Sequence, residues 1–206
     1  MTDRAALLVV AWRDAAPPAP AGWRCEAVLR DQSALDRAGS KGRTPPPFDA
    51  VLWSDDPESA LRPPDGLADH VASWSAFRVV SHPAWDDTAA TGVNPSIKQV
   101  SFLKRRAELT PDEFTRHYRE HVAVARVHHP AICRYAQHDV VETAGSGGLE
   151  THGISELWFA DEATLVARYY AGPDSVPVVR ADNREYIDFA GTLSLLVSPT
   201  DPTPAR

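Results

Sequence analysis

The stretch Thr110-Pro-Asp-Glu-Phe-Thr-Arg-His-Tyr-Arg-Glu-His121 decides the fold of this chain, because it marks where a long helix begins. Thr110 is suited to the N-cap, Pro111 to the first helical position, and Glu113 completes a capping box with Thr110. Aromatic and apolar residues then recur at spacings of three and four, on the face that also carries His121. The pattern predicts an amphipathic helix with His121 on its buried face.

Two roles are open for His121. A buried histidine often only packs, with its ring nitrogens bonded to carbonyl groups, but a neutral imidazole beside a pocket can also act as a general base. His117 lies one turn earlier, and two histidines four residues apart can share a metal ion. No third and fourth ligand follow at a suitable spacing, because Pro130 turns the pair His128 and His129 away from the helix. The sequence therefore predicts no metal site.

Length and charge bound the remaining possibilities. The chain has 206 residues, enough for one large or two small domains, and its formal net charge is -7. Lys and Arg are scattered, so we expect no nucleic-acid partner, and the run Lys104 to Arg106 is interpreted as a solvated strand end. Cys25 and Cys133 lack a partner motif and are expected to be reduced. No signal-type leader or membrane-length apolar run is evident, which predicts a cytoplasmic protein without membrane contact.

The C-terminal half shows the order strand, helix, strand, strand, helix, strand. The helix that begins at Pro111 is expected to end near Val127, and Asp161 caps a second one that ends near Ala171. A shorter irregular helix is expected around Pro177 to Phe189. The order is the split βαβ pattern of a ferredoxin-like sheet, an α+β fold. The expected strands are Ile97–Leu103, Arg134–Glu142, Gly153–Phe159 and Thr192–Ser198.

The N-terminal half contains a weaker copy of this order. Leu52-Trp53 before Asp55 matches Leu157-Trp158 before Asp161, which predicts a strand followed by an acidic helix cap in both halves, although chance similarity is an alternative. The prolines between residues 15 and 20 exclude a first helix, so the His-bearing helix has no counterpart here. The expected strands are 5–12, 23–30, 48–54 and 77–82. We expect two tandem ferredoxin-like domains, residues 1–88 and 96–200, that form one α+β barrel as an intrachain pseudo-dimer.

The C-terminal half, from about Ile97 to Ser198, resembles the EthD family of dimeric α+β barrel proteins. The resemblance implies two ferredoxin-like sheets packed face to face, usually from two chains, with a pocket between a sheet and its helices. Tyr118 stands where tryptophan is often seen, and residues 145–151 lengthen a hairpin. The motifs that carry the resemblance are Lys98 with Leu103-Lys-Arg-Arg106, Thr110-Pro-Asp-Glu-Phe114, His117-Tyr118 with His121-Val-Ala123, Arg134-Tyr135-Ala-Gln137, and Glu156-Leu-Trp-Phe159 before an acidic residue.

The leading functional hypothesis is an enzyme that needs no cofactor. His121 would abstract a proton from a hydrophobic carbonyl or phenolic small molecule, polyketide-like or aromatic, and so start a cyclisation, isomerisation or elimination. Tyr118 or Tyr135 would stabilise the developing enolate oxygen, although each is also suited to simple packing. Glu156 is the carboxylate best suited to orient a histidine. The candidate substrate-binding residues are His117, Phe102, Trp158, Glu156 and His138.

Three alternatives stay open at this point. The chain could be a cofactor-free monooxygenase of the same barrel superfamily, a non-catalytic module that binds a small molecule, or a haem protein with His117, His121 or His138 as the axial ligand. Catalysis is favoured if His121 lines a cavity with a second polar group within hydrogen-bond reach. The expected partner is a small-molecule substrate, and the chain is expected to be a monomeric pseudo-dimer or a homodimer.

Overall fold

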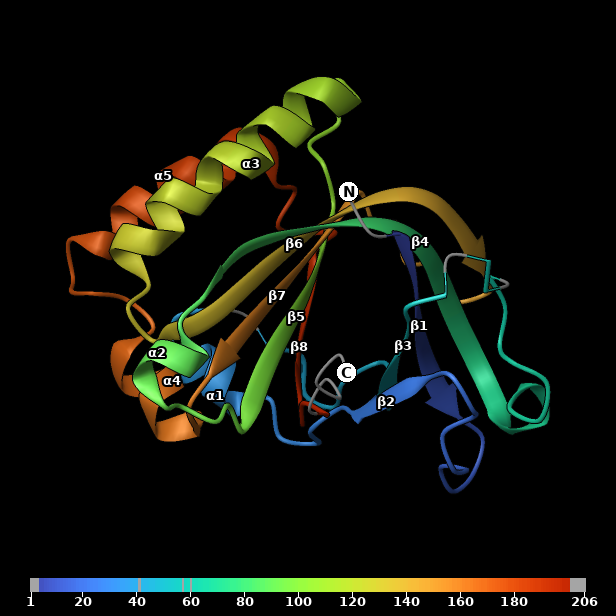
Figure 1. Ribbon diagram of the computed structural model, residues 1–206. Coiled ribbons are helices and arrows are strands. Elements are labelled where there is room, and N and C mark those ends of the chain that lie inside the picture. Colours follow the sequence, from blue (N-terminus) through green and yellow to red (C-terminus); the bar gives the residue numbers. More distant parts are fainter. Residues whose placement is uncertain (1–3, 41, 57, 60, 201–206) are drawn as a thin grey trace.

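The computed structural model describes residues 4–40, 42–56, 58–59 and 61–200. Within these residues, eight strands form one antiparallel sheet in the order β2-β3-β1-β4-β6-β7-β5-β8 (Figure 1). The fold is therefore mixed α+β, as expected. The strands are β1 (Arg4–Trp12), β2 (Arg24–Ala27), β3 (Ala50–Ser54), β4 (Val71–Asp86), β5 (Ile97–Leu103), β6 (Ile132–Gly145), β7 (Gly153–Phe159) and β8 (Leu193–Val197).

The sheet curves until its two outer strands meet. Val28, just after β2, forms an antiparallel bridge with Val197 of β8. The backbone N–H of Leu29 also donates to the carbonyl of Leu196, with a nitrogen-to-oxygen distance of 2.9 Å. Because these contacts join the first and last strands of the order, the sheet is a nearly closed barrel with few free edges.

The helices are distributed unequally over this barrel. Figure 1 shows α3 (Pro111–His128) and α5 (Ser175–Tyr186) side by side across the outer face of the C-terminal strands. Three short helices, α1 (Ser33–Arg37), α2 (Thr88–Thr91) and α4 (Glu162–Arg168), lie near one end of these strands. Between β1 and β2 the described chain forms no helix, in agreement with the prolines there. No helix of the described residues is long and apolar enough to cross a membrane.

Helix α3 begins as its sequence predicts. The backbone N–H of Glu113 donates to the Thr110 hydroxyl at 3.3 Å, and the Glu113 carboxylate accepts from the backbone N–H of Thr110 at 2.8 Å. Phe114, Tyr118 and His121 are all buried on the side that faces the sheet. The capping box and the inward direction of His121 are therefore confirmed.

The N-terminal half differs from its prediction in three places. After β3 the described residues form turns and a 3-10 helix at Ala68–His70, because Pro63 and Pro64 lack the N–H groups that an α-helix needs. Helix α1, between β2 and β3, is not foreseen. Strand β4 begins at Val71 and is longer than expected, because it pairs with β6 along most of its length.

Side chains alternate between two cores. Every second residue of the strands points into the barrel, where Leu7, Val51, Phe77, Val100 and Ile154 belong to one buried cluster. The intervening residues of the C-terminal strands point outward and are covered by helices. Both faces of β5 and β7 are consequently buried along their whole length.

A charged cluster lies among these interior residues and joins the two halves. Lys98 forms ion pairs with Glu26 of β2 and Glu156 of β7, and all three side chains are almost fully buried. His138 Nε2 lies 3.0 Å from Glu156 Oε2, and His138 Nδ1 lies 2.9 Å from the hydroxyl of Ser81. Although burial raises it, Lys98 and His138 hold the pKa of Glu156 at about 2. The Glu156 carboxylate is therefore ionised at neutral pH, whereas burial raises the pKa of Glu26.

We predict that Lys98→Met destabilises the protein by about 3 to 5 kcal/mol, because two buried carboxylates lose their shared cation. Lys104→Met is the matched control, since the Lys104 ion pair with Glu150 is largely exposed, and we expect a much smaller loss of stability. Urea unfolding of both variants measures the difference. Equal losses would show that the buried cluster does not stabilise the barrel.

We further predict that Gly153→Ala destabilises the fold by about 1 to 3 kcal/mol. A Cβ atom at Gly153 would lie 2.9 Å from the Tyr118 ring and 3.2 Å from the Phe114 ring, so α3 must move away from β7. Gly172→Ala is the control, because no atom lies within 4 Å of the added carbon. Thermal unfolding that leaves both variants at the wild-type midpoint would contradict this close approach.

Candidate active site

A cavity of about 550 Å³ lies between the outward face of the C-terminal strands and the helices above it. Its sheet wall comes from β5, β6, β7 and β8, and its opposite wall comes from α3, α5 and the segment after α4. This is the location that the family resemblance implied for a pocket. The side chains that matter most for its chemistry are His121, His129, Tyr135, Gln99, Ser101, Ser155, Ser194, Tyr169, Tyr170, Tyr186 and Phe189.

His121 stands on the helix wall of this cavity. Its Nδ1 lies 2.6 Å from Oδ2 of Asp182, which α5 supplies from the neighbouring helix. The His121 side chain is 11% exposed and that of Asp182 is 28% exposed, so the contact is partly shielded from water. A carboxylate can only accept, so Nδ1 carries the proton and Nε2 is the nitrogen left for a ligand. The second polar group that would favour catalysis over packing is therefore present.

Asp182 is a residue that the sequence did not single out. It lies in the segment expected only to form an irregular helix, and its contact with His121 spans 61 residues of chain. Glu156 was expected to orient a histidine, and it does contact one. That histidine is His138 inside the barrel, not His121.

The two candidate tyrosines differ in their access to the cavity. Tyr135 of β6 lines it, and its hydroxyl accepts a hydrogen bond from Gln137 at 3.0 Å. Burial raises the pKa of Tyr135, so its hydroxyl keeps a proton that it can donate. Tyr118 donates its own proton to the carbonyl of Ile154 at 2.7 Å and does not line the cavity. Tyr118 thus fastens α3 to β7.

His129 is a second histidine in the cavity wall. Its Nδ1 lies 2.6 Å from the carbonyl oxygen of Tyr169 and must donate, which fixes the tautomer. Burial lowers the pKa of His129 to about 4, so the ring is neutral at pH 7. Its ring also lies against Tyr169 and Tyr170, with centroids 4.6 and 5.1 Å away. These contacts hold the aromatic wall in place.

All five expected substrate-binding residues lie outside this cavity. Four of them point into the barrel, because they occupy the alternate positions of β5, β6 and β7, and their role in substrate binding stays a prediction. His117 lies on α3, and its ring stacks on that of Tyr186, with ring centroids 6.4 Å apart. The four interior residues are Phe102, His138, Glu156 and Trp158.

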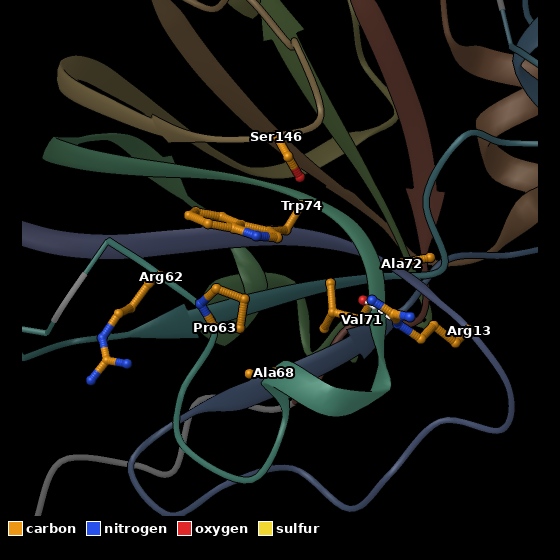
Figure 2. A pocket seen from close by; sticks show the side chains of 8 residues that line it. All are labelled: Arg13, Arg62, Pro63, Ala68, Val71, Ala72, Trp74 and Ser146. Carbon is orange, nitrogen blue, oxygen red and sulfur yellow. Dashed lines mark hydrogen bonds between the residues drawn. The ribbon is translucent and has the colours of Figure 1, made fainter.

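A separate depression of about 340 Å³ occurs in the N-terminal half (Figure 2). Trp74, Pro63 and Val71 form its apolar part. Figure 2 shows the guanidinium groups of Arg13 and Arg62 on opposite sides, and the Arg13 Nε donates to the carbonyl of Val71 at 2.9 Å. No acid or base pair lines it, so the cavity with His121 is the better candidate. The described residues contain no cluster of three or more potential metal ligands.

Comparisons with known proteins agree with this architecture. Residues 106–190 match the family model described as the EthD domain. No curated protein matches the chain significantly. The solved structure of an anthrone oxidase-like protein is 11% identical, has a TM-score of 0.53, and covers 96% of this chain and 91% of its own. At this identity the likeness concerns the fold alone, and it spans both halves.

Two further solved structures have lower scores. A candidate monooxygenase from Lactobacillus acidophilus NCFM is 6% identical with a TM-score of 0.46, covering 96% of this chain and 93% of its own. A candidate chlorite dismutase is 12% identical with a TM-score of 0.44, covering 96% and 95%. The family match, by contrast, includes α3 with its capping box, His121, and the helix that carries Asp182. The similarity to the EthD domain is thus confined to residues 106–190, which contain both helices that cover the sheet.

Proposed function

We propose that the chain is a cofactor-independent enzyme in which His121 abstracts a proton from a hydrophobic carbonyl or phenolic small molecule. The observation that carries this proposal is the 2.6 Å contact between His121 and Asp182 at the wall of a cavity. The carboxylate comes from a neighbouring helix and bonds one ring nitrogen, which leaves the other for a ligand. The pair has the geometry of a general base with its orienting group.

The proposed chemistry begins at Nε2 of His121. The Asp182 carboxylate holds the Nδ1 proton, so the Nε2 lone pair faces the ligand and can take a proton from a carbon next to a carbonyl. The imidazolium that forms is stabilised by the same carboxylate. Tyr135 can donate its hydroxyl proton in a hydrogen bond to the oxygen on which negative charge develops. Return of the proton to a different atom of the substrate completes an isomerisation. Attack of the carbanion on a second carbonyl of the same molecule gives cyclisation, and loss of a leaving group from the neighbouring carbon gives elimination.

The cavity walls fit a flat apolar ligand. Tyr169, Tyr170, Tyr186 and Phe189 line it, and each ring can stack on an aromatic compound. A volume of about 550 Å³ is within the range of small-molecule sites. These features support an aromatic or polyketide-like substrate.

Oxygenation is the second candidate, since a carbanion formed by His121 could also react with dioxygen. The name of the anthrone oxidase-like structure suggests this outcome. For anthrone the balance is one anthrone and one dioxygen giving one anthraquinone and one water. Dioxygen is the oxidant, and the residues required for the first proton transfer are the same in both candidates.

We also propose that the barrel contains two tandem ferredoxin-like domains, residues 1–88 and 96–200, so that a single chain is a complete pseudo-dimer. Each half contributes its strands in the order second, third, first, fourth, which supports a duplication. The N-terminal half lacks a counterpart of α3 among its described residues. We therefore expect one small-molecule site per chain.

We predict that the wild-type protein accelerates hydrogen–deuterium exchange at the methylene carbon of anthrone under anaerobic conditions, measured by NMR. His121→Gln should reduce the rate at least about 100-fold, and Asp182→Asn about 10-fold to 100-fold, because the base is lost or wrongly oriented. His117→Gln is the matched control, since His117 lies on the same helix outside the cavity, and it should keep the wild-type rate.

Three outcomes separate the candidates. A folded His121→Gln protein with undiminished exchange would remove the general base. Wild-type protein that binds anthrone without accelerating exchange would indicate a binding module. Uptake of one dioxygen per anthrone in air, lost in His121→Gln, would favour the oxygenase over the redox-neutral reactions.

A further inference from the structure

The sheet wall of the cavity contains a buried amide whose oxygen has no partner. Gln99 lies on β5, between Leu157 of β7 and Leu196 of β8, and it is 3% exposed. It lines the same cavity as His121. Its Oε1 atom is buried and accepts no hydrogen bond from any described residue. Buried carbonyl oxygens are rarely left in this condition unless a ligand or a water molecule meets them.

The neighbouring hydroxyl groups determine which end of the amide is free. Gln99 Nε2 donates to the Ser101 hydroxyl at 2.8 Å, and the Ser101 and Ser194 hydroxyl oxygens are also 2.8 Å apart. Ser101 can therefore pass its own proton to Ser194 while it accepts from Gln99. This chain of hydrogen bonds uses the amide nitrogen and leaves Oε1 as an acceptor.

Tyr169 is the residue most able to compete for this oxygen. The Gln99 amide lies close enough to lower the pKa of the Tyr169 hydroxyl, although burial has the larger effect and raises it. No hydrogen bond from this hydroxyl to Oε1 is present, so the acceptor stays open. Tyr169 must nevertheless be tested alongside Gln99.

We propose that Gln99 is a specificity-determining residue that accepts a hydrogen bond from a hydroxyl group of the ligand. This inference rests on the proposed function, because it assigns the ligand of the same cavity. His121 stands on the helix wall and Gln99 on the sheet wall, so a flat ligand between them presents its acidic carbon to one and its hydroxyl to the other. The ligand class is thus an aromatic compound with a phenolic hydroxyl away from the reacting carbon.

A site with a buried acceptor binds a ligand that lacks the matching donor less tightly, since the acceptor then stays unpaired. 2-Naphthol and 2-methoxynaphthalene test this point, because they share one ring system and only the first has a proton to donate. Wild-type protein should bind 2-naphthol about tenfold more tightly. Quenching of intrinsic fluorescence or calorimetry measures both dissociation constants without any turnover.

Gln99→Met keeps the length of the side chain and removes the acceptor, so the ratio of the two dissociation constants should fall to about one. Gln99→Glu keeps an oxygen at this position and should retain the preference for 2-naphthol. Tyr169→Phe should also retain it. If Gln99→Met does not fold, as judged by circular dichroism, Gln99→Asn withdraws the oxygen by one methylene and should lose the preference instead.

The proposal is overturned if wild-type protein binds neither compound, shows no preference, or prefers the methoxy compound, which would mean that the amide presents its nitrogen. It is also overturned if Gln99→Met keeps the wild-type ratio. His121→Gln separates this result from the proposed function. It should lose proton exchange and keep the preference, whereas an absence of exchange in wild-type protein leaves the preference of Gln99 intact.

Discussion

The whole structure depends on the two-residue period of strands that are buried on both faces. Along β5, Lys98 and Val100 point into the barrel, whereas Gln99 and Ser101 point toward the helices. A shift of one residue in the pairing of β5 with β7 would exchange these two sets. The hydrophobic interior would then receive the polar wall of the cavity, and Lys98 would lose both glutamates. Register, and not only composition, therefore keeps the two environments separate.

The barrel interior and the helix side of the sheet differ in how they are packed. In the barrel interior the two halves of the chain pack against each other. Aliphatic side chains make this contact around the ion cluster of Lys98, Glu26 and Glu156. On the helix side a cavity remains between α3, α5 and the sheet, and the rings of Tyr169, Tyr170 and Tyr186 line it. Tyr118 fixes the distance at one end through its bond to the carbonyl of Ile154. A rigid frame on one face thus permits an open cavity on the other.

Much of the fold could be predicted from sequence because its strongest signals are local. The capping box at Thr110 and the bounds of β5 and β7 follow from short motifs and from strand-like runs. The length of β4 could not be predicted, since it depends on pairing with β6 across the junction of the two halves. The described residues after β3 form no α-helix, which agrees with Pro63 and Pro64, whose effect outweighs an acidic cap.

The candidate site was only half predictable. The face of α3 that carries His121 follows from helical periodicity, but the face of each strand does not, because β5 and β7 are buried on both sides and show no apolar and polar alternation. The two-residue period of a strand predicts that Gln99 and Phe102 lie on opposite faces of β5. It does not predict which of the two faces α3. Asp182 reaches His121 only through the packing of α5 on α3, which no local pattern encodes.

The proposed general base and the carboxylate that orients it lie on different helices. His121 is carried by α3 and Asp182 by α5, and both helices form the roof of the cavity. Any motion that parts the helices to admit a ligand also lengthens the contact between imidazole and carboxylate. In the proposed mechanism, entry of a ligand between α3 and α5 would therefore disturb the orientation of the base. With the two helices apart, the carboxylate of Asp182 would no longer orient His121. The reactive arrangement would return when the helices close over the bound ligand.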